Sequence, residues 1–101
     1  MKLEKDYQSG LIKRLKDAFP KALVLKNDAG YLQGIPDLLI LNGPKWALLE
    51  IKRSATSPGR PNQAYYVEWS REIGAFGARI FPENESEIVR LLRNHFDGPA
   101  Q

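Results

Sequence analysis

The stretch GIPDLLILNGPKWALLEIK, residues 34–52, contains two apolar runs separated by a turn. Both runs are rich in residues that favour strands, and the Asn-Gly-Pro between them is typical of a hairpin. We therefore predict strands at residues 37–41 and 46–52. Because alternate strand residues share a face, Glu50 and Lys52 would project together while Ile51 enters the core. The apolar character of both faces predicts a sheet that is covered on two sides.

Two carboxylates lie at ends of these strands, Asp37 on the first and Glu50 on the second, thirteen residues apart. Carboxylate oxygens are ligands that Mg²⁺ or Mn²⁺ prefers, and a divalent ion beside the ammonium of Lys52 suits phosphodiester hydrolysis. The alternative for Asp37 is a simple loop-to-strand residue, and for Glu50 and Lys52 a solvated pair. A carboxylate on an apolar strand costs free energy unless it is paired or metal-bound, which favours a site.

Helices and further strands are predicted on either side of this hairpin. Leu3 to Phe19 has an apolar residue at every fourth position and ends at Pro20, which indicates an amphipathic helix. Asn84 with Glu87 resembles a helix-capping arrangement. The remaining expected elements are a strand at 22–26, a helix from Asn62 to Ile73, a strand at 78–81 and a last helix to His95. The order α-β-β-β-α-β-α predicts an α/β fold with a small mixed sheet flanked by helices.

Length and composition exclude several classes of protein. The length of 101 residues indicates one domain over residues 1–101, with residues 97–101 expected to form a disordered tail. The absence of cysteine excludes disulfides and Cys-ligated zinc, and the single histidine leaves little for a multi-histidine site. We find no apolar run of about 18 residues and no secretory signal, so we expect no membrane span and a cytoplasmic location. The net charge of +3 is compatible with a nucleic-acid partner.

Three motifs occur in order on the expected elements: Gly34-Ile35-Pro36-Asp37, Glu50-Ile51-Lys52, and Gln63 followed by Tyr66 at the start of a helix. Together with the element order they resemble the PD-(D/E)xK nucleases, with their restriction-endonuclease-like core. More narrowly, the chain resembles the virus-type replication–repair nuclease (VRR-NUC) family, including its small stand-alone members similar to Holliday-junction resolvases. The resemblance covers most of the chain and implies a Mg²⁺- or Mn²⁺-dependent DNA endonuclease, of viral origin and located in the host-cell cytoplasm.

The resemblance also implies roles for individual residues. Metal ligation falls to Asp37, Glu50 and the backbone carbonyl of Ile51, with Glu4 acting through a water or a second ion. The catalytic set is Asp37, Glu50, Lys52 and Gln63, in which Gln63 supports Lys52 or the attacking water. The alternative for Glu4 is a favourable interaction with the helix dipole, and for Gln63 an ordinary first-turn position.

Candidate DNA contacts lie in or beside the two loops next to the proposed site: Lys26, Tyr31, Arg53, Arg60 and Tyr66. Solvated surface positions are the alternative for the first four. Tyr65, Trp69 and Ile73 fall on one helical stripe, for which core or dimer packing is favoured over base stacking. We expect His95 to be an exposed residue at a helix end.

We therefore expect a homodimeric endodeoxyribonuclease acting on branched DNA such as a four-way junction, because a two-fold dimer with two sites suits paired nicks. The first helix and the Tyr65–Trp69 stripe are the expected dimer surfaces. Two alternatives remain: a non-cleaving DNA-binding or regulatory subunit on a nuclease fold, and a protein-interaction module.

Overall fold

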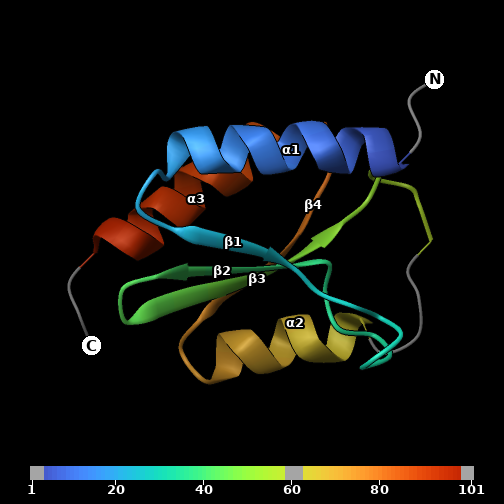
Figure 1. Cartoon of the computed structure of the whole chain (residues 1–101). Coiled ribbons are helices and arrows are strands. Elements are labelled where there is room, and N and C mark those ends of the chain that lie inside the picture. Colours follow the sequence, from blue (N-terminus) through green and yellow to red (C-terminus); the bar gives the residue numbers. More distant parts are fainter. Residues whose placement is uncertain (1–3, 59–62, 99–101) are drawn as a thin grey trace.

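The computed structural model describes residues 4–58 and 63–98, which form a four-stranded sheet with helices on both faces (Figure 1). In chain order the elements are α1 (Glu4–Ala18), β1 (Leu23–Lys26), β2 (Leu38–Asn42), β3 (Lys45–Ile51), α2 (Gln63–Glu72), β4 (Phe76–Ile80) and α3 (Glu85–Asp97). The predicted α-β-β-β-α-β-α order of a small α/β domain is confirmed. Within these two ranges, no helix is long and apolar enough to cross a membrane.

The strands follow one another across the sheet in the order β1-β2-β3-β4. The first three are antiparallel neighbours, whereas β4 runs parallel to β3, so the sheet is mixed. The predicted hairpin joins β2 to β3 through Gly43 and Pro44, and Gly43 adopts a φ of +65° that only glycine tolerates well. As a result, β3 and β4 end at the same edge of the sheet at which β2 begins.

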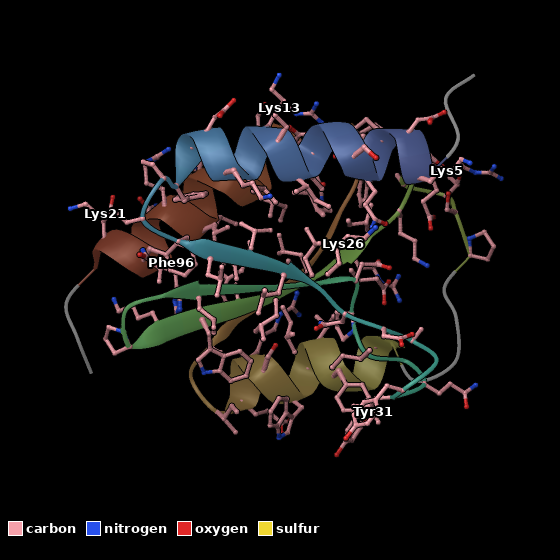
Figure 2. The ribbon with its side chains drawn as sticks, in the orientation of Figure 1. Lys5, Lys13, Lys21, Lys26, Tyr31 and Phe96 are labelled. Atoms are coloured by element: carbon pink, nitrogen blue, oxygen red, sulfur yellow. The ribbon has the colours of Figure 1, made fainter. Side chains whose placement is uncertain are left out.

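One face of the sheet packs against α1 and α3 and forms the core. Alternate strand residues, among them Leu49 and Ile51, join buried residues of both helices in one apolar cluster. The rings of Phe19 and Phe96 meet edge to face with centroids 5.4 Å apart, and Figure 2 shows Phe96 between α3 and the sheet. The apolar side of α1 packs against the sheet in this core. The apolar character of the helix is therefore not evidence for the predicted dimer surface.

The opposite face of the sheet is only half covered. The α2 helix packs chiefly on β3 and β4, where its residues Val67 and Ser70 are buried. Over β1 and β2, three apolar side chains on this face, Leu23, Leu25 and Leu41, are exposed, and Leu39 is half-buried. The prediction of a sheet covered on two sides is therefore right for β3 and β4 and wrong for β1 and β2.

The stripe of aromatic and apolar residues along α2 also lies at the surface. Tyr65, Trp69 and Ile73 are 63%, 38% and 54% exposed. Trp69 contacts the ring of Trp46 on β3, with centroids 5.6 Å apart, and this contact fixes one edge of the stripe against the sheet. The expectation of core packing for the stripe is thus wrong, while packing against a second copy or against DNA bases stays a prediction.

His95 is half-buried rather than exposed, which corrects the prediction for it. Its ring packs 5.8 Å from that of Phe76, and Lys45 Nζ donates hydrogen bonds of 2.7 Å to the carbonyl oxygens of His95 and Gly98. Burial first, and then the charge of Lys45, lower the pKa of His95. Within the predicted tail, Asp97 ends α3 and Gly98 donates its N–H to Asn94, while residues 99–101 lie outside the described chain.

The lowered pKa of His95 predicts an acid-sensitive fold. An unfolded histidine takes up its proton below about pH 6.5, whereas the folded imidazole resists protonation, so the free energy of unfolding falls as the pH decreases through this range. His95 is the only histidine in the chain, so no other side chain with an ordinary pKa titrates between about pH 5.5 and 7. Urea unfolding at several pH values checks this. The fall should disappear in His95→Gln, and an equal fall in both proteins contradicts the assignment.

Candidate metal and nucleic-acid site

The segment before β2 is fixed by the side chain and backbone of Asn27. Asn27 donates its backbone N–H to Asp37 O and its side-chain amide to Pro36 O, each at 2.8 Å. Gly34, in the same loop, has a φ of +85°. The loop of turn-forming residues that precedes Asp37 is therefore tied to the end of β1, and it delivers Asp37 to the edge of the sheet where β3 ends.

Asp37 reaches across to β3 with its carboxylate. Its Oδ2 accepts the backbone N–H of Ile51 at 2.7 Å. Leu38 pairs with Leu49, so continuing this antiparallel register by one residue places Asp37 opposite Glu50. In a strand, the N–H and C=O of one residue point in the same direction, so the carbonyl of Ile51 also faces Asp37. Asp37, Glu50 and this carbonyl are thus neighbours at one edge of the sheet.

Glu50 in β3 and Lys52 directly after this strand project toward α2, because Leu49 and Ile51 belong to the core on the other face. The exposed fractions of Glu50 and Lys52 are 0% and 5%. Lys52 Nζ lies 3.9 Å from Glu50 Oε2 and donates a 3.1 Å hydrogen bond to Pro58 O. The alternative of a solvated pair is therefore wrong. Buried charges are costly unless they are paired, and here the ammonium of Lys52 lies beside the carboxylate of Glu50.

Arg79 is also part of this cluster, although the sequence predicts for it only a position within a strand. Its Nε lies 2.9 Å from Glu50 Oε2, and the parallel register pairs Glu50 with Arg79 directly. Asn84 holds the same end of β4: it donates to Arg79 O at 3.0 Å and accepts from Phe81 N–H at 2.9 Å. Asn84 does occupy the N-cap position of α3, but its side chain makes no capping bond, contrary to the predicted capping arrangement.

Glu4 begins α1, and Tyr7 and Arg14 further along this helix fix it to the start of α3. Tyr7 donates a 2.8 Å hydrogen bond to Glu85, and Arg14 pairs with the same carboxylate at 2.6 Å. The hydrogen bonds from Arg14 and Tyr7 lower the pKa of Glu85, whereas burial and the Glu85 contact raise that of Tyr7. These contacts join α1 to the segment that follows β4. The role of Glu4 beside the metal stays a prediction.

The donor set fits a hard divalent ion in part. Mg²⁺ is commonly held by one or two carboxylates together with waters and phosphate oxygens, which Asp37 and Glu50 can match. A carboxylate accepts several bonds at once, so the bond between Asp37 and Ile51 is compatible with ligation. Across residues 4–58 and 63–98, no three histidine, cysteine or acidic side chains gather closely enough to hold a metal.

The predicted DNA contacts are distributed around this edge. Lys26 at the end of β1 and Arg53 after β3 are exposed, and Tyr31 is 91% exposed. Figure 2 shows Tyr31 at the outer end of the loop between β1 and β2, on the side of the sheet that carries α2. Tyr66 is half-buried, with its ring 5.0 Å from that of Tyr65. Arg60 and the side chain of Gln63 lie outside the described part of the chain.

Comparison with known proteins adds no relative. Searches against protein-family models, curated proteins and solved structures find no match to this chain. The functional interpretation therefore rests on the geometry above and on the motifs.

Proposed function

We propose that this chain is a metal-dependent DNA endonuclease with a PD-(D/E)xK-type core. The observation that carries the proposal is the antiparallel register of β2 and β3, whose continuation by one residue sets Asp37 opposite Glu50, with Lys52 Nζ 3.9 Å from the Glu50 carboxylate. Burying this cluster in a domain of 101 residues is costly, and a structural salt bridge would be replaceable by apolar residues at little loss of stability. A chemical role accounts for the retained charges.

Each residue of the cluster has a distinct task in phosphodiester hydrolysis. Bound Mg²⁺ or Mn²⁺ would polarise the scissile phosphate and lower the pKa of a bound water. Asp37, Glu50 and the carbonyl of Ile51 would hold the ion. Lys52, whose ammonium is fixed by Pro58 O, would orient the attacking water and offset negative charge that develops on the phosphate. Gln63 at the start of α2 would support Lys52 or the water.

DNA is the proposed substrate because cationic and aromatic side chains border the same edge of the sheet. Lys26, Arg53 and Arg60 would contact phosphates, a sequence-independent source of affinity. Tyr31 would offer its exposed ring to an unpaired base, because stacking of a base on an aromatic side chain contributes about 1–3 kcal/mol. Tyr66 would contact the DNA from the first turns of α2. An exposed aromatic of this kind favours substrates with accessible bases.

We further propose that two copies act together on branched DNA. The exposed stripe of Tyr65, Trp69 and Ile73 on α2 would pack against a second copy, and a two-fold pair would present two sites for paired nicks. A groove of about 390 Å³ beside this stripe, lined in part by Glu68 and Glu72, offers room for a partner side chain. Four-way junctions are the substrates that such paired sites suit.

One experiment separates the proposal from its alternatives. The pure chain is incubated with Mg²⁺ or Mn²⁺ and end-labelled four-way junction, linear duplex or single strand, with EDTA as the control. We expect metal-dependent cleavage, strongest on the junction, and a dimer mass on the junction by light scattering. Metal-independent binding without cleavage indicates a non-cleaving subunit. No retention of DNA even at low salt, where phosphate contacts are strongest, indicates a protein-interaction module.

A further inference from the structure

We propose that Arg79 is a metal-responsive positioning residue: it neutralises Glu50 before the metal binds, and then transfers to a phosphate of the DNA. This inference rests on the proposed function. It assigns to Arg79 a role that neither the motifs nor the resemblance includes. Arg79 comes from β4, the strand that lies parallel to β3, whereas the motif residues come from the β2–β3 hairpin.

The contact geometry places Arg79 between Glu50 and solvent. The carboxylate of Glu50 has no exposed surface, whereas the Arg79 side chain, 2.9 Å away, is 49% exposed. Lys52, whose Nζ lies 3.9 Å from the same carboxylate oxygen, is nearly as buried as Glu50, with 6% of its side chain exposed. Of these two described cations, Arg79 is therefore the one that can move outward. An ion that reaches Glu50 from solvent must compete with its guanidinium.

The charge balance of the cluster gives the direction of the change. Among the described residues, the two carboxylates Asp37 and Glu50 lie beside two cations, Lys52 and Arg79, both of which pair with Glu50. Adding a divalent cation at Asp37 and Glu50 makes the cluster strongly positive, and the attraction that holds Arg79 to Glu50 is lost. Lys52 is retained by its bond to Pro58 O, so Arg79 is the group that leaves. A guanidinium displaced in this way is well suited to a phosphate, which it can bind with two parallel hydrogen bonds.

There is room for the displaced side chain. Arg79 lines an open groove of about 390 Å³ between α2 and the start of α3, together with residues that include Glu68, Arg71 and Asn84. The backbone of Arg79 does not need to move, because Asn84 holds its carbonyl oxygen at 3.0 Å. The guanidinium can therefore rotate about its own side-chain bonds while β4 stays in register with β3. Arg79 would then couple metal binding to DNA binding.

The first test measures metal affinity without catalysis. Mn²⁺ is titrated calorimetrically into wild type, Arg79→Ala and Arg79→Gln, after circular dichroism has confirmed that each variant is folded. Removing an ion pair that competes for Glu50 should raise the affinity for Mn²⁺ about tenfold in both variants. Arg79→Lys should stay near wild type. Arg90→Ala is the matched control, because this substitution also removes one positive charge. Among the described contacts, Arg90 forms an ion pair only with Glu87, which is exposed on α3. Equal or weaker Mn²⁺ binding by the Arg79 variants overturns the proposal.

The second test measures the phosphate contact. Junction binding is followed against salt concentration, once in EDTA and once in Ca²⁺ as a divalent ion for the binding assay. One lost phosphate contact reduces the logarithmic salt slope by about 0.9 on duplex DNA. Arg79→Ala should show this reduction in Ca²⁺ and match wild type in EDTA. An unchanged slope in Ca²⁺ overturns the transfer to phosphate. If neither wild type nor Arg79→Ala binds Mn²⁺, the proposed nuclease function fails as well. If both bind Mn²⁺ equally, only the role proposed for Arg79 fails.

Discussion

Asp37→Asn should lower the rate of junction cleavage about a thousandfold, because loss of one metal-binding carboxylate removes several kcal/mol of transition-state stabilisation. The amide of asparagine is nearly the same shape as the carboxylate. It keeps an oxygen that can accept the hydrogen bond from Ile51 N–H, which is 2.7 Å long in the wild type. The fold should therefore survive while the negative charge is lost. Single-turnover cleavage of a labelled junction at saturating Mg²⁺ measures the effect, with the melting temperature recorded in parallel.

A matched control lies in the same loop. Asp28 is exposed, and its Oδ1 accepts the N–H of Gly30 at 2.8 Å, a bond that asparagine also makes. Asp28→Asn changes the net charge by the same amount and should cleave like wild type. If Asp37→Asn cleaves at a rate close to that of Asp28→Asn, Asp37 is not part of the catalytic site.

Gly77→Ala should destabilise the fold by about 3 kcal/mol or more, at or above the usual upper end for overpacking. A Cβ at this position would lie 2.6 Å from the backbone oxygen of Val67 and still closer to Ser70 Oγ. Backbone cannot rotate away as a side chain can, so α2 must lift from the sheet. Each kcal/mol lowers the melting temperature of a domain of this size by about 4–8 °C. Thermal unfolding followed by circular dichroism measures the loss.

Gly10→Ala provides the comparison for the same chemical change. The atom that a new Cβ would meet there is Arg14 Nη1 at 2.9 Å, at the far end of a flexible side chain. Alanine is favoured over glycine inside a helix by up to about 1 kcal/mol, so this variant should be as stable as wild type or more so. Gly77→Ala with an unchanged melting temperature would show that α2 does not pack on β4 as described.

Much of the site could be predicted because its central residues are local in sequence. The turn at Gly43 pairs Asn42 with Lys45, and counting outward along an antiparallel hairpin then brings Asp37 opposite Glu50. The strand pattern also gives the shared face of Glu50 and Lys52. These inferences need only the hairpin and the alternation of side chains.

Other features depend on contacts that are distant in sequence. The contact between Arg79 and Glu50 requires the parallel register of β4 on β3, which a loop and α2 separate along the chain. Periodicity shows that Tyr65 and Trp69 share a helical stripe, but not that α2 covers only β3 and β4 and leaves this stripe exposed. The half-burial of His95 depends likewise on Phe76 from another element. A single sequence contains no local signal for these pairings.

The most direct test of the central claim is Mn²⁺ binding followed by electron paramagnetic resonance, with wild type compared with Asp37→Asn and Glu50→Gln. The geometry of Asp37, Glu50 and the Ile51 carbonyl predicts that wild type removes Mn²⁺ from the free-ion signal and that each variant does so much more weakly. A wild-type protein that leaves the Mn²⁺ signal unchanged, or variants that bind as wild type does, would contradict a metal site at this edge of the sheet.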